Sequence, residues 1–437
     1  MYEGNRYLSD AINRRRWTIA FLLSLGVLVN YFDRVNLTVS HDALTSEFGI
    51  NDVTFGFLLG AYNWTYAACQ LPSGVLLDRF GVRKVGIVSI LLWSIASFAA
   101  ALTRGVGGFL GARFLLGVGE ASTFPANAKA IGYWFPAEQR SLATSLFDAS
   151  AKLSSAIGVP LIGFLLLRVG WRLSFVATGV VSLLYFVIFY MLYRDPQSDT
   201  SLTSTGNTTD SSYPANEGNT LSVTPKSNIS VLYLLSRKNV IGLAVGFGSY
   251  NYVFYLMLTW LPVYLSRALH IDLAHSFAYT GVPWICATAA DLIVGGWLVD
   301  WLIRRGWNAD RVRRVVLIGG TTMGLGILGA THAHTPGQAL FWISLSISGL
   351  SAAAPVGWSI PSLIAPGDSV GKVGGIMNLS NQISGIAAPI ITGYLVSGRQ
   401  SFGAAFGVAA TYLVIGILAY IFLLGEIRPI AFPVRTA

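Results

Sequence analysis

Charged side chains are scarce in this chain. Asp, Glu, Lys and Arg make up 11% of its 437 residues, whereas soluble domains carry about 25%. Hydrophobic residues make up 53% of the chain. So few charges cannot cover the surface of a soluble enzyme, so the composition indicates a protein that crosses the membrane many times. The lipid bilayer is therefore its first expected partner.

Cysteine and histidine are also rare, with two and five residues. Cys69 and Cys286 both lie in apolar runs, so they predict no disulfide framework. His332 and His334 flank a short loop, where we expect them to be solvated. The sequence shows no His/Cys metal cluster, phosphate-binding loop or nucleophile motif. We therefore expect no metal, no cofactor, no catalytic residue and no enzymatic activity.

The net charge of +9 is concentrated in the loops between apolar runs. If the N-terminus lies inside, 20 of the 29 Lys and Arg residues fall in inner segments, five in outer loops and four within helices. Cytoplasmic loops carry this bias, so it predicts cytoplasmic termini rather than a nucleic-acid partner. The first apolar run is too long for a signal peptide and lacks a cleavage site. We expect a multi-pass protein of the cell inner (plasma) membrane.

Windows of about 20 apolar residues predict an all-α fold with twelve transmembrane helices. Residues 194–238 are rich in Ser, Thr, Asn and Asp and predict a flexible cytoplasmic linker. The expected domains are a six-helix half at 1–193, this linker, and a second six-helix half at 239–437. The expected spans are 17–39, 53–77, 84–103, 107–133, 141–167, 172–193, 239–266, 276–302, 313–331, 337–360, 371–396 and 402–424.

An acid and a base, Asp33 and Arg34, lie side by side inside the first span. A charge in hydrocarbon costs at least a few kcal/mol, so such residues normally face a bundle interior or a wet cavity. Adjacent helical residues point about 100° apart, which argues against a simple salt bridge between the two. We expect Arg34 to face an anion and Asp33 to face a proton route.

The fourth span carries Arg113, Gly117, Glu120 and Phe124 at a spacing that places them on one helical face. An arginine offers a planar fork that fits a carboxylate. Glu120 in a poorly solvated site can take up and release a proton. Two other interpretations remain open: a structural ion pair between helices, and a position of Arg113 among the outer lipid headgroups.

Asp148 and Lys152 in the fifth span are four residues apart and face the same side. They either neutralise each other, or Lys152 is a second cationic contact for an anionic substrate and Asp148 holds it when the site is empty. The sequence favours neither interpretation. Asp291, in the eighth span, is a further acid whose face the pattern leaves open.

Neutral polar and aromatic residues occupy other spans. Tyr62 and Tyr66 are one turn apart and can aim their hydroxyl groups at a polar solute, or simply pack. Trp358 lies near the end of the tenth span. Asn378 and Asn381 share a face of the eleventh span, where their amides need partners. Substrate hydroxyl groups and neighbouring helices are equally suitable partners.

A short motif follows the second span and is partly repeated after the eighth. The first copy contains Gly74, Asp78, Arg79, Gly81 and Arg83, and the second contains Gly296 and Asp300 before two arginines. This pattern resembles the signature loop of the major facilitator superfamily. The resemblance implies two pseudo-symmetric six-helix halves, a central cavity and alternating access. In that fold the motif residues belong to a gate on the cytoplasmic face.

The first half also resembles the anion:cation symporters, the branch that includes bacterial D-galactonate and hexuronate transporters and the lysosomal sialic-acid exporter. The resemblance implies that Asp33 and Glu120 take part in proton coupling. It further implies that Arg34, Tyr66 and Arg113 serve a carboxylate site and that Asn378 contacts the polar body of the substrate. Asp148 and Lys152 depart from the pattern. The residues that carry the resemblance are Asn30-Tyr31-Phe32-Asp33-Arg34, Trp64-x-Tyr66, Gln70-Leu71-Pro72, the Arg113 to Glu120 run, and Gly374-Gly375 with Asn378.

Together these observations predict a proton-coupled symporter that imports a small organic anion. A sugar acid (an aldonate, hexuronate or aldarate) is the favoured substrate, and a monomer is expected. The alternatives are a symporter or exporter of another carboxylate, such as tartrate, phthalate or another aromatic acid, and a non-transporting membrane sensor on the same fold. The residues expected to bind substrate are Arg34, Tyr62, Tyr66, Arg113, Lys152, Trp358, Asn378 and Asn381.

Overall fold

The computed structural model describes residues 2–135, 140–195, 229–333, 335–365, 369–399 and 402–430. Within these ranges the chain forms helices and no strand. In chain order the helices are α1 (Tyr2–Val39), α2 (His41–Phe48), α3 (Asp52–Leu102), α4 (Val106–Glu120), α5 (Thr123–Trp134), α6 (Arg140–Leu192), α7 (Val231–Leu235), α8 (Lys238–Ala268), α9 (Leu273–Ala290), η2 (Asp291–Leu298), α10 (Val299–Arg304), α11 (Ala309–Gly324), η3 (Leu325–His332), α12 (Pro336–Ile364), α13 (Val370–Arg399), α14 (Gly403–Leu418) and η5 (Ala419–Leu424).

Twelve helical segments in the described ranges are long enough to cross a bilayer. α3 and α6 each contain two, because the chain changes direction at Gly81 (φ 79°) and Gly170 (φ 82°), a backbone conformation that glycine adopts without strain. α4 with α5 forms one crossing, and so does the continuous run α9, η2 and α10. The described residues therefore confirm the predicted all-α fold with twelve transmembrane helices.

Side-chain caps fix where several of these helices begin. Asn51 accepts a hydrogen bond from the Thr54 amide at the start of α3, and Asn308 does the same for α11. Such caps satisfy backbone N–H groups that have no partner within the helix. In between, the apolar spans leave many large hydrophobic side chains on the outside, such as Phe21 (61% exposed) and Phe422 (70% exposed). An outer surface of this kind suits lipid rather than water.

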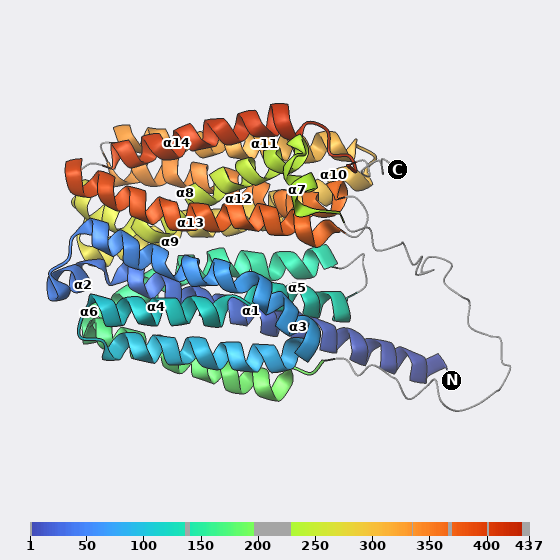
Figure 1. Ribbon diagram of the computed structural model, residues 1–437, viewed down its shortest axis with the longest axis horizontal. Helices are drawn as coiled ribbons and strands as arrows, with labels where there is room; N and C mark the ends of the chain where they lie inside the picture. The colour runs from blue at the N-terminus through green and yellow to red at the C-terminus, as the bar shows by residue number, and fades with distance from the viewer. Residues whose placement is uncertain are drawn as a thin grey trace.

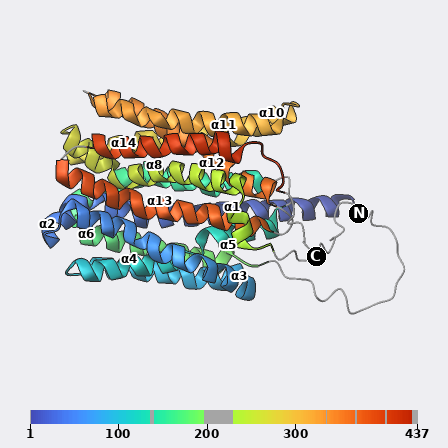
Figure 2. The same cartoon turned by 45° about the horizontal axis from the view of Figure 1, so that its top comes forward.

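The helices form two groups that lie side by side (Figures 1 and 2). The first group contains α1 to α6, and the second contains α7 to α14. The groups meet mainly where α3 packs against α13 and where α6 packs against α9. The predicted boundaries at 193 and 239 stay a prediction, because most of the linker, residues 196–228, lies outside the described residues.

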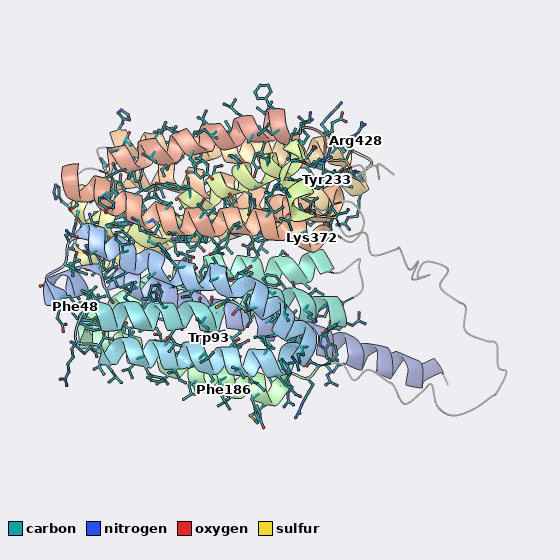
Figure 3. All side chains as sticks on the ribbon, in the orientation of Figure 1. Phe48, Trp93, Phe186, Tyr233, Lys372 and Arg428 are labelled. Carbon is teal, nitrogen blue, oxygen red and sulfur yellow. The ribbon has the colours of Figure 1, made fainter. Side chains whose placement is uncertain are left out.

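The two ends of the bundle differ. Helix α2 marks one end, here called the α2 end, and the chain termini mark the other, here called the terminal end (Figure 1). Phe48 lies at the α2 end, whereas Tyr233, Lys372 and Arg428 lie at the terminal end (Figure 3). An odd number of membrane crossings separates Phe48 from each of the other three residues, as their positions at opposite ends require.

The two groups are closed against each other at the α2 end. A β-carbon at Gly56 of α3 would lie 2.6 Å from the Pro389 carbonyl oxygen of α13, and one at Gly281 of α9 would lie 2.6 Å from the Ala156 carbonyl oxygen of α6. Glycine at these positions lets the backbones of the two groups touch. Arg267 of α8 adds an ion pair with Asp52 of α3 at 2.8 Å.

Candidate functional site

A buried ion pair lies at the centre of the first helix group. Arg34 of α1 donates from Nε to Glu120 Oε2 at 2.9 Å, and its Nη2 lies 2.8 Å from the same oxygen. The two residues are 5% and 0% exposed. Both nitrogens converge on one carboxylate oxygen, while Glu120 Oε1 has no hydrogen-bond partner within the protein. The pair is thus only partly satisfied, and polar capacity remains free in a buried place.

Three tyrosine rings surround the Arg34 guanidinium group. Its central carbon lies 4.3 Å from the ring centre of Tyr31, 4.7 Å from that of Tyr62 and 5.6 Å from that of Tyr66. A guanidinium group over aromatic faces is attracted by the ring quadrupoles. The cage therefore stabilises a cation in the membrane without neutralising it, and the charge stays available to an anion.

Asp33 has other partners than Arg34. Ser97 Oγ donates to Asp33 Oδ1 at 2.6 Å, and Ser182 Oγ donates to Asp33 Oδ2 at 3.0 Å. Asp33 is 2% exposed and faces the side of α1 that packs on α3 and α6. The adjacent residues of α1 thus point into separate environments, one lined by hydroxyl groups and the other by tyrosine rings and Glu120.

Arg113 lies between these two environments. Its Nη1 donates to the Asp33 carbonyl oxygen at 3.4 Å, and its guanidinium carbon lies 5.5 Å from the ring centre of Tyr62. The residue is 3% exposed, so it points into the helix group and not toward lipid headgroups. Its Nε has no hydrogen-bond partner within the protein. A second arginine with free donor capacity therefore lies close to the first.

Gly117 explains how α4 brings Arg113 and Glu120 so close to the tyrosines. A β-carbon at this position would lie 2.1 Å from Thr65 Oγ1 and 2.2 Å from the Tyr62 carbonyl oxygen. Only glycine fits there, and the backbones of α3 and α4 approach each other closely as a result. The predicted one-sided stripe is buried at Arg113, Gly117 and Glu120. α4 ends at Glu120, so Phe124 belongs to the next helix, α5.

The second helix group reaches this centre through Tyr255 of α8. The hydroxyl groups of Tyr62 and Tyr255 lie 3.1 Å apart. Asn63 Nδ2 donates to the Gly385 carbonyl oxygen of α13 at 3.0 Å, one residue further along α3. Tyr62, predicted as a substrate contact, thus also joins the two groups, so any separation of the groups disturbs the ring that covers Arg34.

Two predicted substrate-binding amides have partners within the protein. Asn378 Nδ2 donates to Gln70 Oε1 across the two groups at 2.5 Å, and Asn251 Nδ2 donates to Asn381 Oδ1 at 2.8 Å. Trp358 is 40% exposed and packs its ring edge-on against Phe247, with ring centres 5.3 Å apart. Within the described part of the chain, none of these residues makes a hydrogen bond or ion pair with Arg34 or Glu120. Their roles in substrate binding stay predictions.

Lys152 has two carboxylate partners. Its Nζ lies 2.7 Å from Asp148 Oδ2 on α6 and also contacts Asp291 Oδ2 on η2 of the second group. The sequence left the face of Asp291 open, and the structure directs it at Lys152. Because both carboxylates occupy the ammonium group here, the predicted substrate contact at Lys152 stays a prediction.

The loop motif lies at the terminal end. Gly81 forms its sharp turn, and the Arg83 amide donates to Asp195 Oδ2 at 3.1 Å. Arg79 lies over the ring of Phe80, at 5.2 Å. The side chain of Asp78 lies outside what the structure describes. In the second copy, the Asp300 side chain is exposed and its backbone oxygen accepts a hydrogen bond from Arg304 Nε. In the first copy, no atom of the described residues lies within 4 Å of the β-carbon position of Gly74.

Two cavities lie away from the buried charges. One of about 650 Å³ opens at the terminal end between the start of α8 and the end of η5. The other, of about 320 Å³, lies at the α2 end between α1, α6, α8 and α9. Neither is lined by Arg34, Glu120 or Lys152. Arg34, Glu120 and Lys152 are themselves buried in this conformation.

Comparisons with known proteins agree with this architecture. The family profile of the Major Facilitator Superfamily matches residues 23–309. The uncharacterized transporter YybO of Bacillus subtilis (strain 168) is 37% identical over 418 residues, which cover 95% of this chain and 95% of that protein. A probable galactarate/D-glucarate transporter of the same strain is 29% identical over 431 residues, which cover 94% of this chain and 92% of that protein.

A solved structure has the same fold. A bacterial homologue of the human lysosomal transporter Spinster, in an inward-facing and occupied conformation, superposes with a TM-score of 0.72 at 16% sequence identity. The superposition covers 93% of this chain and 96% of that chain. At this identity the likeness concerns the arrangement of the helices alone.

Proposed function

Because this chain belongs to the Major Facilitator Superfamily and is a membrane transporter, we propose that it imports a small organic anion together with protons. The observation that carries the proposal is the buried contact between Arg34 and Glu120. It joins a permanent cation to a group that can be neutralised by a proton. Members of this fold move substrates by alternating access around a central site, and this contact provides a means of coupling.

The coupling rests on competition for Arg34. While Glu120 is ionised, its Oε2 accepts the hydrogen bond from Arg34 Nε and lies 2.8 Å from Nη2. A proton on Glu120 removes the negative charge and releases Arg34 for the carboxylate of the substrate, to which the guanidinium fork is well matched. Binding of the anion then favours protonation, and release of one favours release of the other.

Asp33 supplies a second proton site in this scheme. Its carboxylate accepts hydrogen bonds from Ser97 and Ser182. Arg113 donates to the backbone carbonyl oxygen of the same residue. Protonation there weakens the attraction on Arg113, whose unused Nε can turn to the substrate. Both acids are buried, so neutral forms of the site cross the occluded state at a lower electrostatic cost.

We assign the substrate to the sugar acids. The first helix group supplies two arginines for the carboxylate, and the second supplies amides and aromatic residues, among them Asn378, Asn381 and Trp358, for a hydroxylated body. The relative that is 29% identical is named as a probable galactarate/D-glucarate transporter, which supports this class. The runner-up is another carboxylate, such as tartrate or an aromatic acid, and the experiment below separates the two.

The proposed orientation places the terminal end in the cytoplasm of a bacterium and the α2 end outside the inner membrane. The excess of Lys and Arg in the loops of the terminal end supports it. Since the two helix groups are closed at the α2 end, this conformation is then closed to the outside. The loop motif around Gly81 and Arg83 lies on the cytoplasmic face in the same orientation.

Transport by the purified chain tests the proposal. Proteoliposomes with a neutral interior are diluted into acidic buffer, and uptake of radiolabelled galactarate, D-glucarate and D-galactonate is compared with uptake of tartrate and phthalate. We expect accumulation above the external concentration, and its loss when a protonophore collapses the gradient. Uptake whose rate and extent are the same with and without the proton gradient would refute proton coupling. Accumulation of aromatic acids with no sugar acid among the substrates would refute the substrate class and leave the coupling intact.

A further inference from the structure

A second buried cluster of charges joins the two helix groups. Lys152 lies between Asp148, one turn earlier on α6, and Asp291, the first residue of η2. Both carboxyl groups contact the same nitrogen, Lys152 Nζ. The side chains of Asp148, Lys152 and Asp291 are 16%, 2% and 0% exposed. One ammonium group therefore faces two carboxyl groups in a place that water hardly reaches.

Among the described residues, no cation near this cluster is left over to neutralise its second carboxylate. In the first group, Arg34 and Arg113 balance Asp33 and Glu120. If every group is ionised, three cations face four carboxylates in the buried centre of the described chain. The seven groups are Arg34, Arg113, Lys152, Asp33, Glu120, Asp148 and Asp291. A buried charge without a partner is costly, and an incoming anion would increase the excess.

The elements packed against η2 bring no further cation to Asp291. These are α6, α9, α10 and α12. α12 contains no ionisable residue, the histidine, tyrosine and cysteine of α9 are exposed, and Asp300 and Arg304 of α10 are exposed at the terminal end. From α8, Tyr250 interacts with Lys152. Both oxygens of Asp291 lack a regular hydrogen bond within the protein.

We propose that Asp291, Asp148 and Lys152 form a proton-binding site at the contact between the two helix groups. One proton from water, shared by the two carboxyl groups, lets one carboxyl donate to the other and leaves a single carboxylate for the ammonium group. The cluster is then neutral. When the groups separate and water enters, the proton returns to water. This site is additional to Asp33 and Glu120 and exists whether or not those two residues couple transport.

The backbone at Asp291 fits a binding role. The helix widens into a π-helix over Asp291–Leu298. Such turns are rare in proteins, and those that occur are often found at functional sites. Gly295, one turn further, has its β-carbon position 2.6 Å from the Ala352 carbonyl oxygen of α12, so η2 is pressed against α12 on one side. Asp291 is left facing α6, where Lys152 lies.

Infrared spectroscopy of the full-length protein in lipid nanodiscs tests the proposal without any transport assay. Carbon-13 aspartate labelling identifies the carbonyl stretch of protonated Asp carboxyl groups at neutral pH. We expect the wild-type band to lose intensity in both Asp291→Asn and Asp148→Asn, since each leaves one carboxylate for Lys152. In Lys152→Gln the band should instead persist to higher pH, because two carboxyl groups then lack their cation.

The exposed Asp300→Asn serves as the matched control, and its spectrum should equal that of the wild type. If Asp291→Asn fails to fold, the half-buried Asp148→Asn carries the test. A band unchanged in both neutralising variants overturns the proposal. A wild-type spectrum without the band also overturns it. If sodium ions then raise the melting temperature of the wild type but not of Asp291→Asn, the cluster binds a metal cation instead. Neither result touches the coupling proposed for Glu120.

Discussion

Arg34 and Glu120 come from helices α1 and α4 and meet through a single carboxylate oxygen, Oε2, which both guanidinium nitrogens approach within 3 Å, at 2.9 and 2.8 Å. The other oxygen of Glu120 has no partner within the protein. A purely structural ion pair gains most when both oxygens are used. The one-sided geometry leaves a place where a proton can bind, and it makes the pair easy to exchange for a substrate carboxylate.

Glu120→Gln separates proton coupling from substrate binding. Glutamine can still accept a hydrogen bond from Arg34 but cannot take up a proton. We expect the variant to keep counterflow exchange of the labelled anion and to lose proton-driven accumulation, both measured in proteoliposomes. The exposed Glu426→Gln is the control and should retain both activities. Equal loss of exchange and accumulation in Glu120→Gln would refute its role as a coupling acid.

Arg34→Lys tests the fork that binds the carboxylate. Lysine keeps the charge but offers neither the planar pair of donors nor a flat surface for the tyrosine rings. A hydrogen bond to a charged group contributes about 1.5–3 kcal/mol, which corresponds to a rise in KM for the anion of about tenfold to a hundredfold. Uptake kinetics measure it, with the exposed Arg428→Lys as control. An unchanged KM would place the substrate carboxylate elsewhere.

Much of the fold could be predicted from the sequence because the bilayer imposes a strong pattern. A run of about 20 apolar residues has few alternatives to a membrane helix, so all twelve segments were predictable. The high cost of an ionised group in hydrocarbon also predicted that four charged residues of the first half face the bundle interior. They are Asp33, Arg34, Arg113 and Glu120. Glycine spacing in α4 also carried information, because Gly117 is required by the close approach of α3.

The contacts between the two helix groups could not be predicted in the same way. Whether Asp291 faces lipid, its own group or Lys152 depends on the π-helical turn of η2, which shifts the helical period where the residue lies. The pairing of Tyr62 with Tyr255 depends on how two groups dock, and no local periodicity encodes that docking. The sequence identified the residues that have chemistry, and the structure shows which of them meet.

Gly117→Ala tests the close approach of α3 and α4. The added methyl group would clash with the Tyr62 carbonyl oxygen and with Thr65, and overpacking of this kind costs about 1–3 kcal/mol. Its matched control is Gly111→Ala on the same helix, where nothing lies within 4 Å of the added atom. We expect a lower melting temperature for Gly117→Ala and an unchanged or higher one for Gly111→Ala. Equal values for both would show that the backbones need not approach so closely.

The ion pairs at the α2 end should close that end in a pH-dependent manner. Arg267 of α8 pairs with Asp52 at 2.8 Å and with Asp42 at 3.5 Å, and His41 contacts both carboxylates. The hydrogen bond from His41 lowers the pKa of Asp42. At Asp52 burial acts to raise the pKa, but His41 and Arg267 outweigh it and hold the pKa below its ordinary value.

Since the folded pKa values of both carboxyl groups are lowered, their contribution to closure is present above the ordinary carboxyl pKa and is lost as pH falls through the lowered values. Exposed pairs contribute about 0.2–1 kcal/mol each. Arg267 makes two such pairs, so Arg267→Gln should open the α2 end up to about thirtyfold more often at neutral pH. The measurement is the rate at which an impermeant thiol reagent labels Ser266→Cys, in a background with Cys69 and Cys286 replaced by serine. The ratio of the Arg267→Gln rate to the parent rate should fall toward one in acid, and a ratio that stays constant with pH would show that these pairs do not close the transporter.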